Sequence, residues 1–94
     1  MRERRFRNVW DAIETSPEEA ANMKARSDVL IAIRQTIDDW NVTQSAAARR
    51  LGITQPRLND LMRGRVNKFS LDALTNLAAR AGLSVRVRVV RSAA

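Results

Sequence analysis

Amide and guanidinium side chains are concentrated between residues 54 and 63, in a segment whose spacing predicts a short helix. Gln and Asn carry a donor and an acceptor side by side, and Arg carries a planar fork of donors. These groups can form paired hydrogen bonds with flat polar surfaces such as the edges of nucleic-acid bases. Leu58, Leu61 and Met62 would occupy the buried side of this helix. The outward positions are then Thr54, Gln55, Pro56, Asn59, Asp60 and Arg63.

Other chemistries are poorly supplied by this sequence. It contains no cysteine and no histidine, which removes disulfides, thiolate nucleophiles, imidazole acid–base pairs and nearly all zinc sites. The acids at positions 18–19 and 38–39 are adjacent, so on a helix they point apart rather than converge. There is no glycine-rich phosphate loop. We therefore expect neither an enzyme nor a cofactor.

Positive charge is strongly biased toward the second half of the chain. Residues 43–94 contain ten Lys/Arg against two Asp/Glu, whereas residues 1–42 contain seven against eight. A basic half of a small domain indicates a polyanionic partner, although a merely soluble surface is the plain alternative. The candidate contacts to the phosphates of such a partner are Arg49, Arg50, Arg57, Arg65 and Lys68.

Helix start and stop signals predict four helices, one of which carries the polar residues of positions 54–63. Ser16 precedes Pro-Glu-Glu, a capping sequence for a helix over residues 17–40, with Met23, Leu30, Ile33, Ile37 and Trp40 on one apolar stripe. Three shorter helices are capped by Thr43, Thr54 and Ser70, and reach residues 51, 63 and 81. Residues 66–69 are expected to form a loop.

The two middle helices share a restrictive pattern. Small Ala48 allows close packing and Gly52 allows a reversal of the chain. An apolar wedge is supplied by Leu51, Ile53, Leu58 and Leu61. This spacing predicts two helices crossing at a tight turn and is rarely met by accident, with an ordinary pair of antiparallel helices as the alternative.

The two ends of the chain add possible interaction surfaces. Residues 83–91 alternate apolar and polar side chains, which predicts a half-buried strand. No second strand is evident, so pairing with the same strand of a second copy through Val85, Val87 and Val89 is expected; a frayed basic tail is the alternative. Near the start, a short amphipathic segment supplies either a partner surface or a cover for the domain's own core or dimer interface, through Phe6, Val9, Trp10 and Ile13.

No membrane association is expected, because the longest strongly apolar run, residues 29–33, is far too short to span a bilayer. The basic first residues are followed by no apolar stretch, so we expect no secretory signal there. Together with the lack of cysteine, this favours a cytoplasmic protein.

Residues 43–83 resemble the Cro/repressor-like (XRE) helix-turn-helix family, and the whole chain is similar to HigA-type antitoxins. The likeness rests on residues 16–27, 51–58 and 69–74 and on the Val/Arg strand. It implies an all-α, five-helix, lambda-repressor-like fold with a C-terminal strand shared across a homodimer. The chain would be a single domain, residues 1–94, with an N-terminal helical segment at 6–40, a helix-turn-helix core at about 43–83 and a strand at 83–91.

The resemblance also implies a function and roles for particular residues. A dimer would bind double-stranded DNA at a partly palindromic operator and repress its own operon, with a cognate toxin as a second partner. Base contacts would come from Gln55, Pro56 and Asn59, and Gln44, next to the capping Thr43, would bond a backbone phosphate. The alternatives are a repressor without a toxin, and a protein-interaction module that binds little or no specific DNA.

Two residues depart from an ideal reading helix. Pro56 has no N–H, so it can make only apolar contact, for example with a thymine methyl group. Asp60 places an acid toward the duplex, where it would accept from a cytosine amino group or hold Arg63 or Arg57 in position.

Overall fold

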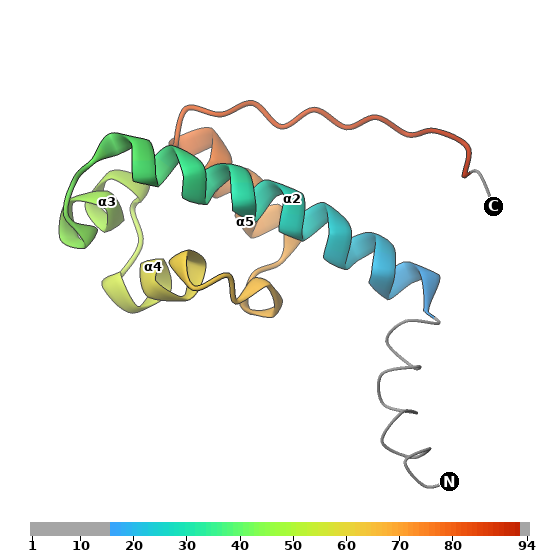
Figure 1. Ribbon diagram of the computed structural model, residues 1–94, viewed down its shortest axis with the longest axis horizontal. Helices are drawn as coiled ribbons and strands as arrows, with labels where there is room; N and C mark the ends of the chain where they lie inside the picture. Colours follow the sequence, from blue (N-terminus) through green and yellow to red (C-terminus); the bar gives the residue numbers. More distant parts are fainter. Residues whose placement is uncertain (1–15, 93–94) are drawn as a thin grey trace, which may run out of the picture.

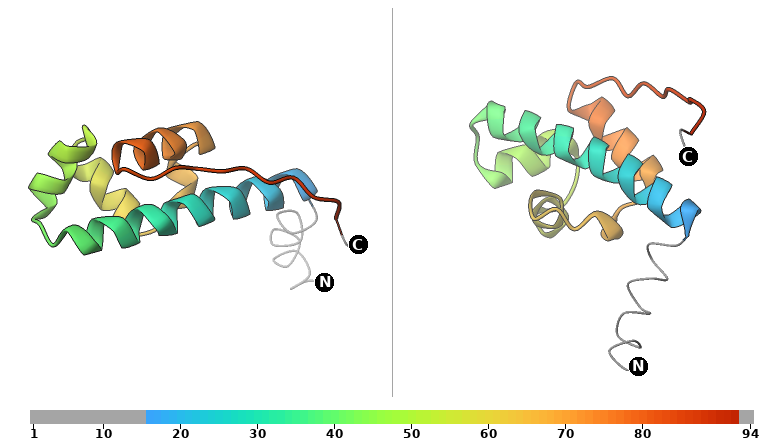
Figure 2. Two further views of the ribbon diagram at one scale, coloured as in Figure 1. Left: turned by 90° about the horizontal axis from the view of Figure 1, so that it is seen from above. Right: turned by 45° about the vertical axis from the view of Figure 1, so that its right-hand side comes forward.

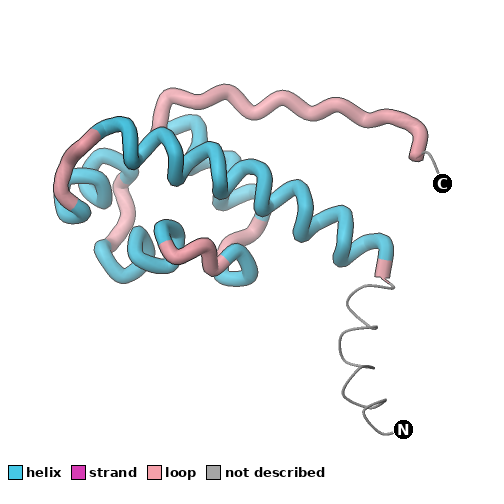
Figure 3. The backbone as a smooth tube through the Cα atoms, in the orientation of Figure 1, coloured by secondary structure: helices cyan, strands magenta, loops and turns pink. Residues whose placement is uncertain are grey.

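The computed structural model describes residues 16–92, and within them the fold is all-α (Figures 1 and 3). Four α-helices and one 3-10 turn follow one another, and none of the described residues forms a strand. The elements are α2 (Pro17–Trp40), α3 (Gln44–Leu51), α4 (Gln55–Met62), η1 (Val66–Lys68) and α5 (Leu71–Arg80). Long α2 is the spine of the domain, and α5, η1 and α4 pack against it.

The four α-helices begin where their caps predicted. Ser16, Thr43, Thr54 and Ser70 each accept a hydrogen bond from the backbone N–H three residues later, at 3.0–3.2 Å. A capping side chain satisfies one of the amides that a helix start leaves without an intrahelical partner. Local sequence therefore determines these helix starts. The ends of α4 and α5 each fall one residue earlier than expected, and the predicted loop at 66–69 contains the 3-10 turn.

The core lies where the helices cross. Leu51, Leu58 and Leu61 of the predicted wedge are fully buried together with Ile33 and Leu74. The fourth wedge residue, Ile53, is half-buried and packs against this core. The stripe on α2 is buried at Leu30, Ile33 and Ile37 but not at Met23, which is 37% exposed. The first turns of α2 extend beyond the other described helices (Figure 1), so those helices do not bury the N-terminal part of the stripe.

The predicted C-terminal strand is not formed in the single chain. Residues 83–91 are extended and run back along the first half of α2, on the side away from α4 (Figures 1 and 2). A strand needs a neighbouring strand to accept its hydrogen bonds, and residues 16–92 offer none. Within residues 16–92 the expected strand is therefore corrected to an extended tail, and four of the five expected helices are present. The fifth, expected near Phe6, Val9, Trp10 and Ile13, lies outside the described residues.

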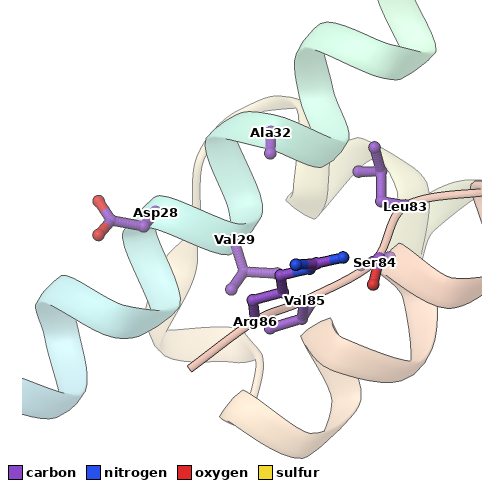
Figure 4. Close-up of a pocket in the computed structure, with 8 residues that line it drawn as sticks. Asp28, Val29, Ala32, Leu83, Ser84, Val85 and Arg86 are labelled. Carbon is purple, nitrogen blue, oxygen red and sulfur yellow. The ribbon is translucent and has the colours of Figure 1, made fainter. Parts of the chain in front are cut away.

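A groove of about 220 Å³ opens where the tail leaves the domain, between α2 and the end of α5 (Figure 4). Val29, Leu83 and Val85 surround this space, and the carboxylate of Asp28 is turned away from it. The remaining lining residues are Ala32, Ala78, Ser84 and Arg86.

Candidate nucleic-acid interface

The turn between α3 and α4 is fixed by its backbone and by one distant side chain. Gly52 has a φ of 71°, a left-handed conformation that favours glycine, and the Ile53 amide donates to the carbonyl of Ala48 at 3.0 Å. From the last turn of α5, Arg80 Nη1 donates to the Leu51 carbonyl at 2.9 Å. The angle between the two helices is thus set by the sequence of the turn and by α5.

The first turn of α4 presents its polar side chains to solvent. Thr54, Gln55 and Pro56 are exposed, Asn59 is half-buried on the same helix, and Arg63 is exposed at its end. Leu58 and Leu61 hold the opposite side in the core. The burial pattern agrees with the predicted orientation of α4, which offers amide groups at its N-terminal end and a guanidinium at its C-terminal end.

Asp60 pairs with a residue that the sequence analysis did not assign to it. Its Oδ1 atom accepts from Arg65 Nη1 at 3.0 Å, and the Arg65 amide donates to the Asp60 carbonyl at 3.0 Å. Gly64, with a φ of 73°, turns the chain back and brings Arg65 over the end of α4. Of the two roles considered for Asp60, the pairing with Arg57 or Arg63 is replaced by a pairing with Arg65, and the contact with a cytosine amino group stays a prediction. One candidate phosphate contact, Arg65, therefore already has a carboxylate partner.

Arg57 turns away from the exposed face of α4. Its Nη1 atom donates to the carbonyl of Lys68 at 2.7 Å, and its guanidinium lies 4.0 Å from the centre of the Phe69 ring. From α2, Arg26 donates to the carbonyls of Val66 and Phe69 at 3.2 and 3.3 Å. These two arginines fasten the segment after α4 from both sides and leave the Lys68 side chain exposed.

The start of α3 and its basic end supply the remaining predicted contacts. Thr43, Gln44, Arg49 and Arg50 are all exposed. The guanidinium of Arg50 lies 4.0 Å from the centre of the Trp40 ring, so it covers this half-buried aromatic residue. Gln44 occupies the first position of α3, where free backbone amides point out of the helix.

One electrostatic feature was missed by the sequence analysis, although the sequence contains it. The first turn of α2 carries Glu18 and Glu19, and that of α5 carries Asp72, which compensate the positive ends of those helices. The first turns of α3 and α4 contain no acidic residue. Two neighbouring helix N-termini are therefore left without compensation by an acid in their own first turns, and such termini favour phosphate groups.

A short helix, a glycine turn and a second helix with a polar exposed first turn define a helix-turn-helix domain. The chain belongs to this family, because a family model described as a helix-turn-helix domain matches residues 12–90. A solved structure named as a candidate XRE family transcriptional regulator is similar to it at 27% identity and a TM-score of 0.72, covering 80% of this chain and 84% of that chain. No curated protein sequence matches the chain significantly.

The protein is therefore a helix-turn-helix domain akin to XRE transcriptional regulators, a non-enzymatic class whose fold implies DNA binding. This confirms the family-level part of the expected resemblance. Within residues 16–92, no cluster of acidic side chains could hold a metal ion. No helix in that range is long and apolar enough to cross a membrane.

Proposed function

We propose that the protein is a sequence-specific transcriptional regulator that reads double-stranded DNA with α4. Thr54, Gln55, Pro56, Asn59 and Arg63 face the base edges in the major groove, and Asp60 lies at the rim of that face with Arg65. The observation that carries the proposal is the exposed polar first turn of α4 on a helix-turn-helix whose opposite side is fully buried. Amides and guanidinium groups are the side chains best suited to adenine and guanine.

Phosphate contacts position this reading face. The residues that would make these contacts are all exposed: Thr43 and Gln44 at the start of α3, Arg49 and Arg50 at its end, and Lys68 in η1. The acid-free starts of α3 and α4 support the assignment, because phosphates compensate the helix dipoles there. Arg57 and Arg65 contribute less than their charges suggest, since each already has a polar partner in the protein. Arg50 stacks on Trp40 but has no such polar partner among the described residues.

Selection of bound duplexes from a random-sequence pool tests this proposal. The full chain is mixed with the pool, bound duplexes are recovered over several rounds, and the products are sequenced. Enrichment of a defined motif of a few base pairs is expected, repeated in inverted orientation about 10 base pairs away, centre to centre. The matched control is the Gln55→Ala/Asn59→Ala variant, which should lose the motif. A pool that stays unenriched would contradict sequence-specific binding.

The expected inverted repeat requires that the protein binds DNA as a homodimer. The extended tail, residues 84–91, leaves the domain on the side of α2 away from α4, so pairing through the tail leaves both reading faces uncovered (Figures 1 and 2). Two such domains can then place their α4 helices in successive major grooves of one face of the duplex.

The narrower role, an autorepressing antitoxin with a toxin partner, rests on the resemblance and not on any described contact. Its predicted toxin surface at residues 6–13 lies outside the described residues. Binding to the duplex upstream of the protein's own gene tests autorepression. Co-purification with the product of the neighbouring gene tests the partner, and failure of the second test alone would leave a regulator without a toxin.

A further inference from the structure

We propose that the extended tail pairs with the tail of a second copy in a register centred on Val87, and that salt strengthens this pairing while it weakens DNA binding. The inference rests on the homodimer in the proposed function and specifies how that dimer is regulated.

The backbone of the tail is unpaired. Within residues 16–92, no backbone N–H or C=O group from position 84 to position 91 forms a hydrogen bond. The valines beside it are unusually open: Val85 is 37% exposed, Val87 83% and Val89 89%. A free edge with apolar side chains at alternate positions is the surface that a second strand covers.

Symmetry restricts the register. In an antiparallel pair, directly opposite side chains lie on the same face of the sheet. A two-fold axis therefore requires that the central residue of the tail faces the same residue of the second copy. An axis at Val87 places Val85 opposite Val89 of the second copy and keeps all the alternating valines together. Because Val85 lines the groove between α2 and α5, Val89 of the second copy then lies at the edge of that apolar space (Figure 4).

The same register sets positive charges against one another. Arg86 stands opposite Arg88 of the second copy, and symmetry repeats the pair. Neither arginine has an ion-pair partner among the described residues, and the nearby Asp28 pairs with Lys24 at 3.2 Å. Like charges directly opposite in a sheet destabilise it, at Cβ separations of about 4.5–5.5 Å.

Salt relieves this repulsion. The screening length falls from about 10 Å at 0.1 M to about 3 Å at 1 M, which is shorter than the separation of the paired arginines. Binding to DNA responds in the opposite way, because salt weakens phosphate contacts. Occupancy of an operator with two half-sites therefore depends on salt in two opposing ways, because salt strengthens the dimer and weakens its contacts with DNA.

Sedimentation equilibrium of the full chain in NaCl, from about 0.05 to about 1 M, tests the proposal. The dimer dissociation constant should fall roughly tenfold or more across this range. Arg86→Glu, which sets a carboxylate opposite Arg88, should tighten the dimer at low salt by about tenfold and reverse the salt dependence. The matched control is Arg91→Glu, which makes the same change in charge outside the Arg86–Arg88 pairs and should leave the direction of the salt dependence unchanged.

The Arg86→Gln/Arg88→Gln variant removes both charges and so separates two effects of salt, the screening of arginine repulsion and the strengthening of apolar contacts between valines. If screening is responsible, the dimer of this variant should be nearly insensitive to NaCl. A native dimer that salt weakens, or equal effects of Arg86→Glu and Arg91→Glu, would overturn the proposed register while leaving the homodimer intact. Val87→Asp should make the chain monomeric at every salt concentration. A dimer that persists in Val87→Asp overturns pairing through the tail, and a native chain that is monomeric throughout overturns the homodimer itself.

Discussion

Arg80 and Gly52 lie in contact across the domain: Arg80 Nη1 is 3.1 Å from the position that a Cβ atom on Gly52 would occupy. The same nitrogen donates to the Leu51 carbonyl, the last of α3. The Arg80 guanidinium from α5 therefore caps the C-terminal end of α3 and fills the space beside Gly52. This contact connects the C-terminal helix with the angle at which α4 is presented.

We predict that Gly52→Ala destabilises the protein more than Gly82→Ala does. Both glycines have left-handed φ values, 71° and 85°, so both variants bear the strain of about 1–2 kcal/mol for a residue with a Cβ. Only the Cβ at Gly52 meets a neighbour, since nothing lies within 4 Å of the corresponding position at Gly82. Thermal unfolding followed by circular dichroism measures both. In an Arg80→Ala background the two variants should cost the same, and a persistent difference there would exclude Arg80 as its cause.

Arg57→Ala should act on stability, and Arg49→Ala on DNA binding. Arg57 loses a charged hydrogen bond to Lys68 and its stacking on Phe69, a cost of about 1–2 kcal/mol, which lowers the melting temperature by several degrees. Exposed Arg49 has no such contact within residues 16–92, so Arg49→Ala should leave the melting temperature nearly unchanged and weaken binding to all duplexes. Equal melting temperatures for the two variants would show that Arg57 is not held in the fold.

Asn59→Ala and Lys68→Ala should differ in specificity. Asn59 is placed to read a base, so its loss should cost about 1–3 kcal/mol on the preferred duplex and little on a scrambled one. Exposed Lys68 is placed beside the phosphates, so its loss should weaken both duplexes alike and reduce the salt slope by about 1. Anisotropy titrations on the two duplexes measure both. An Asn59→Ala variant that weakens random DNA equally would mean that α4 is turned differently in the groove.

Asp60→Asn should tighten binding to every duplex by a few-fold. The substitution removes a negative charge from the rim of the reading face and releases Arg65 from its ion pair. The cost to stability should be about 1 kcal/mol, because the Arg65 side chain is 44% exposed, which screens the pair, whereas the Asp60 side chain is only 20% exposed. The same titrations, with unfolding as a control, measure both effects. Weaker binding to the preferred duplex alone would instead assign Asp60 to a base contact.

Local signals predicted most of this fold. The caps at Ser16, Thr43, Thr54 and Ser70 act within one turn of the chain, so the sequence alone located all four helix starts correctly. The wedge residues were predictable because the helical spacing of the apolar residues and the position of Gly52 leave few ways to pack α3 against α4. The orientation of the exposed α4 residues followed from the same pattern.

Long-range partners were not predictable from the sequence. Arg26 and Arg57 meet carbonyl groups of the η1 segment, and Arg80 meets that of Leu51, because of how the helices pack. Counting charges had assigned Arg57 to the phosphates, whereas three-dimensional packing gives it a structural contact. The tail shows a further limit: alternation predicted its extended conformation, but whether an extended segment becomes a strand depends on a neighbour that one chain does not contain.

Sequence-specific recognition by α4 is tested most directly by fluorescence anisotropy at about 0.15 M salt, where charge effects are short-ranged. The duplex recovered from the random pool is compared with a scrambled duplex of equal length and composition. We predict a preference of roughly a thousandfold or more, with affinity that falls steeply as salt rises, and loss of the preference in Gln55→Ala/Asn59→Ala. Equal binding to both duplexes would contradict a reading role for α4 and leave only a basic surface.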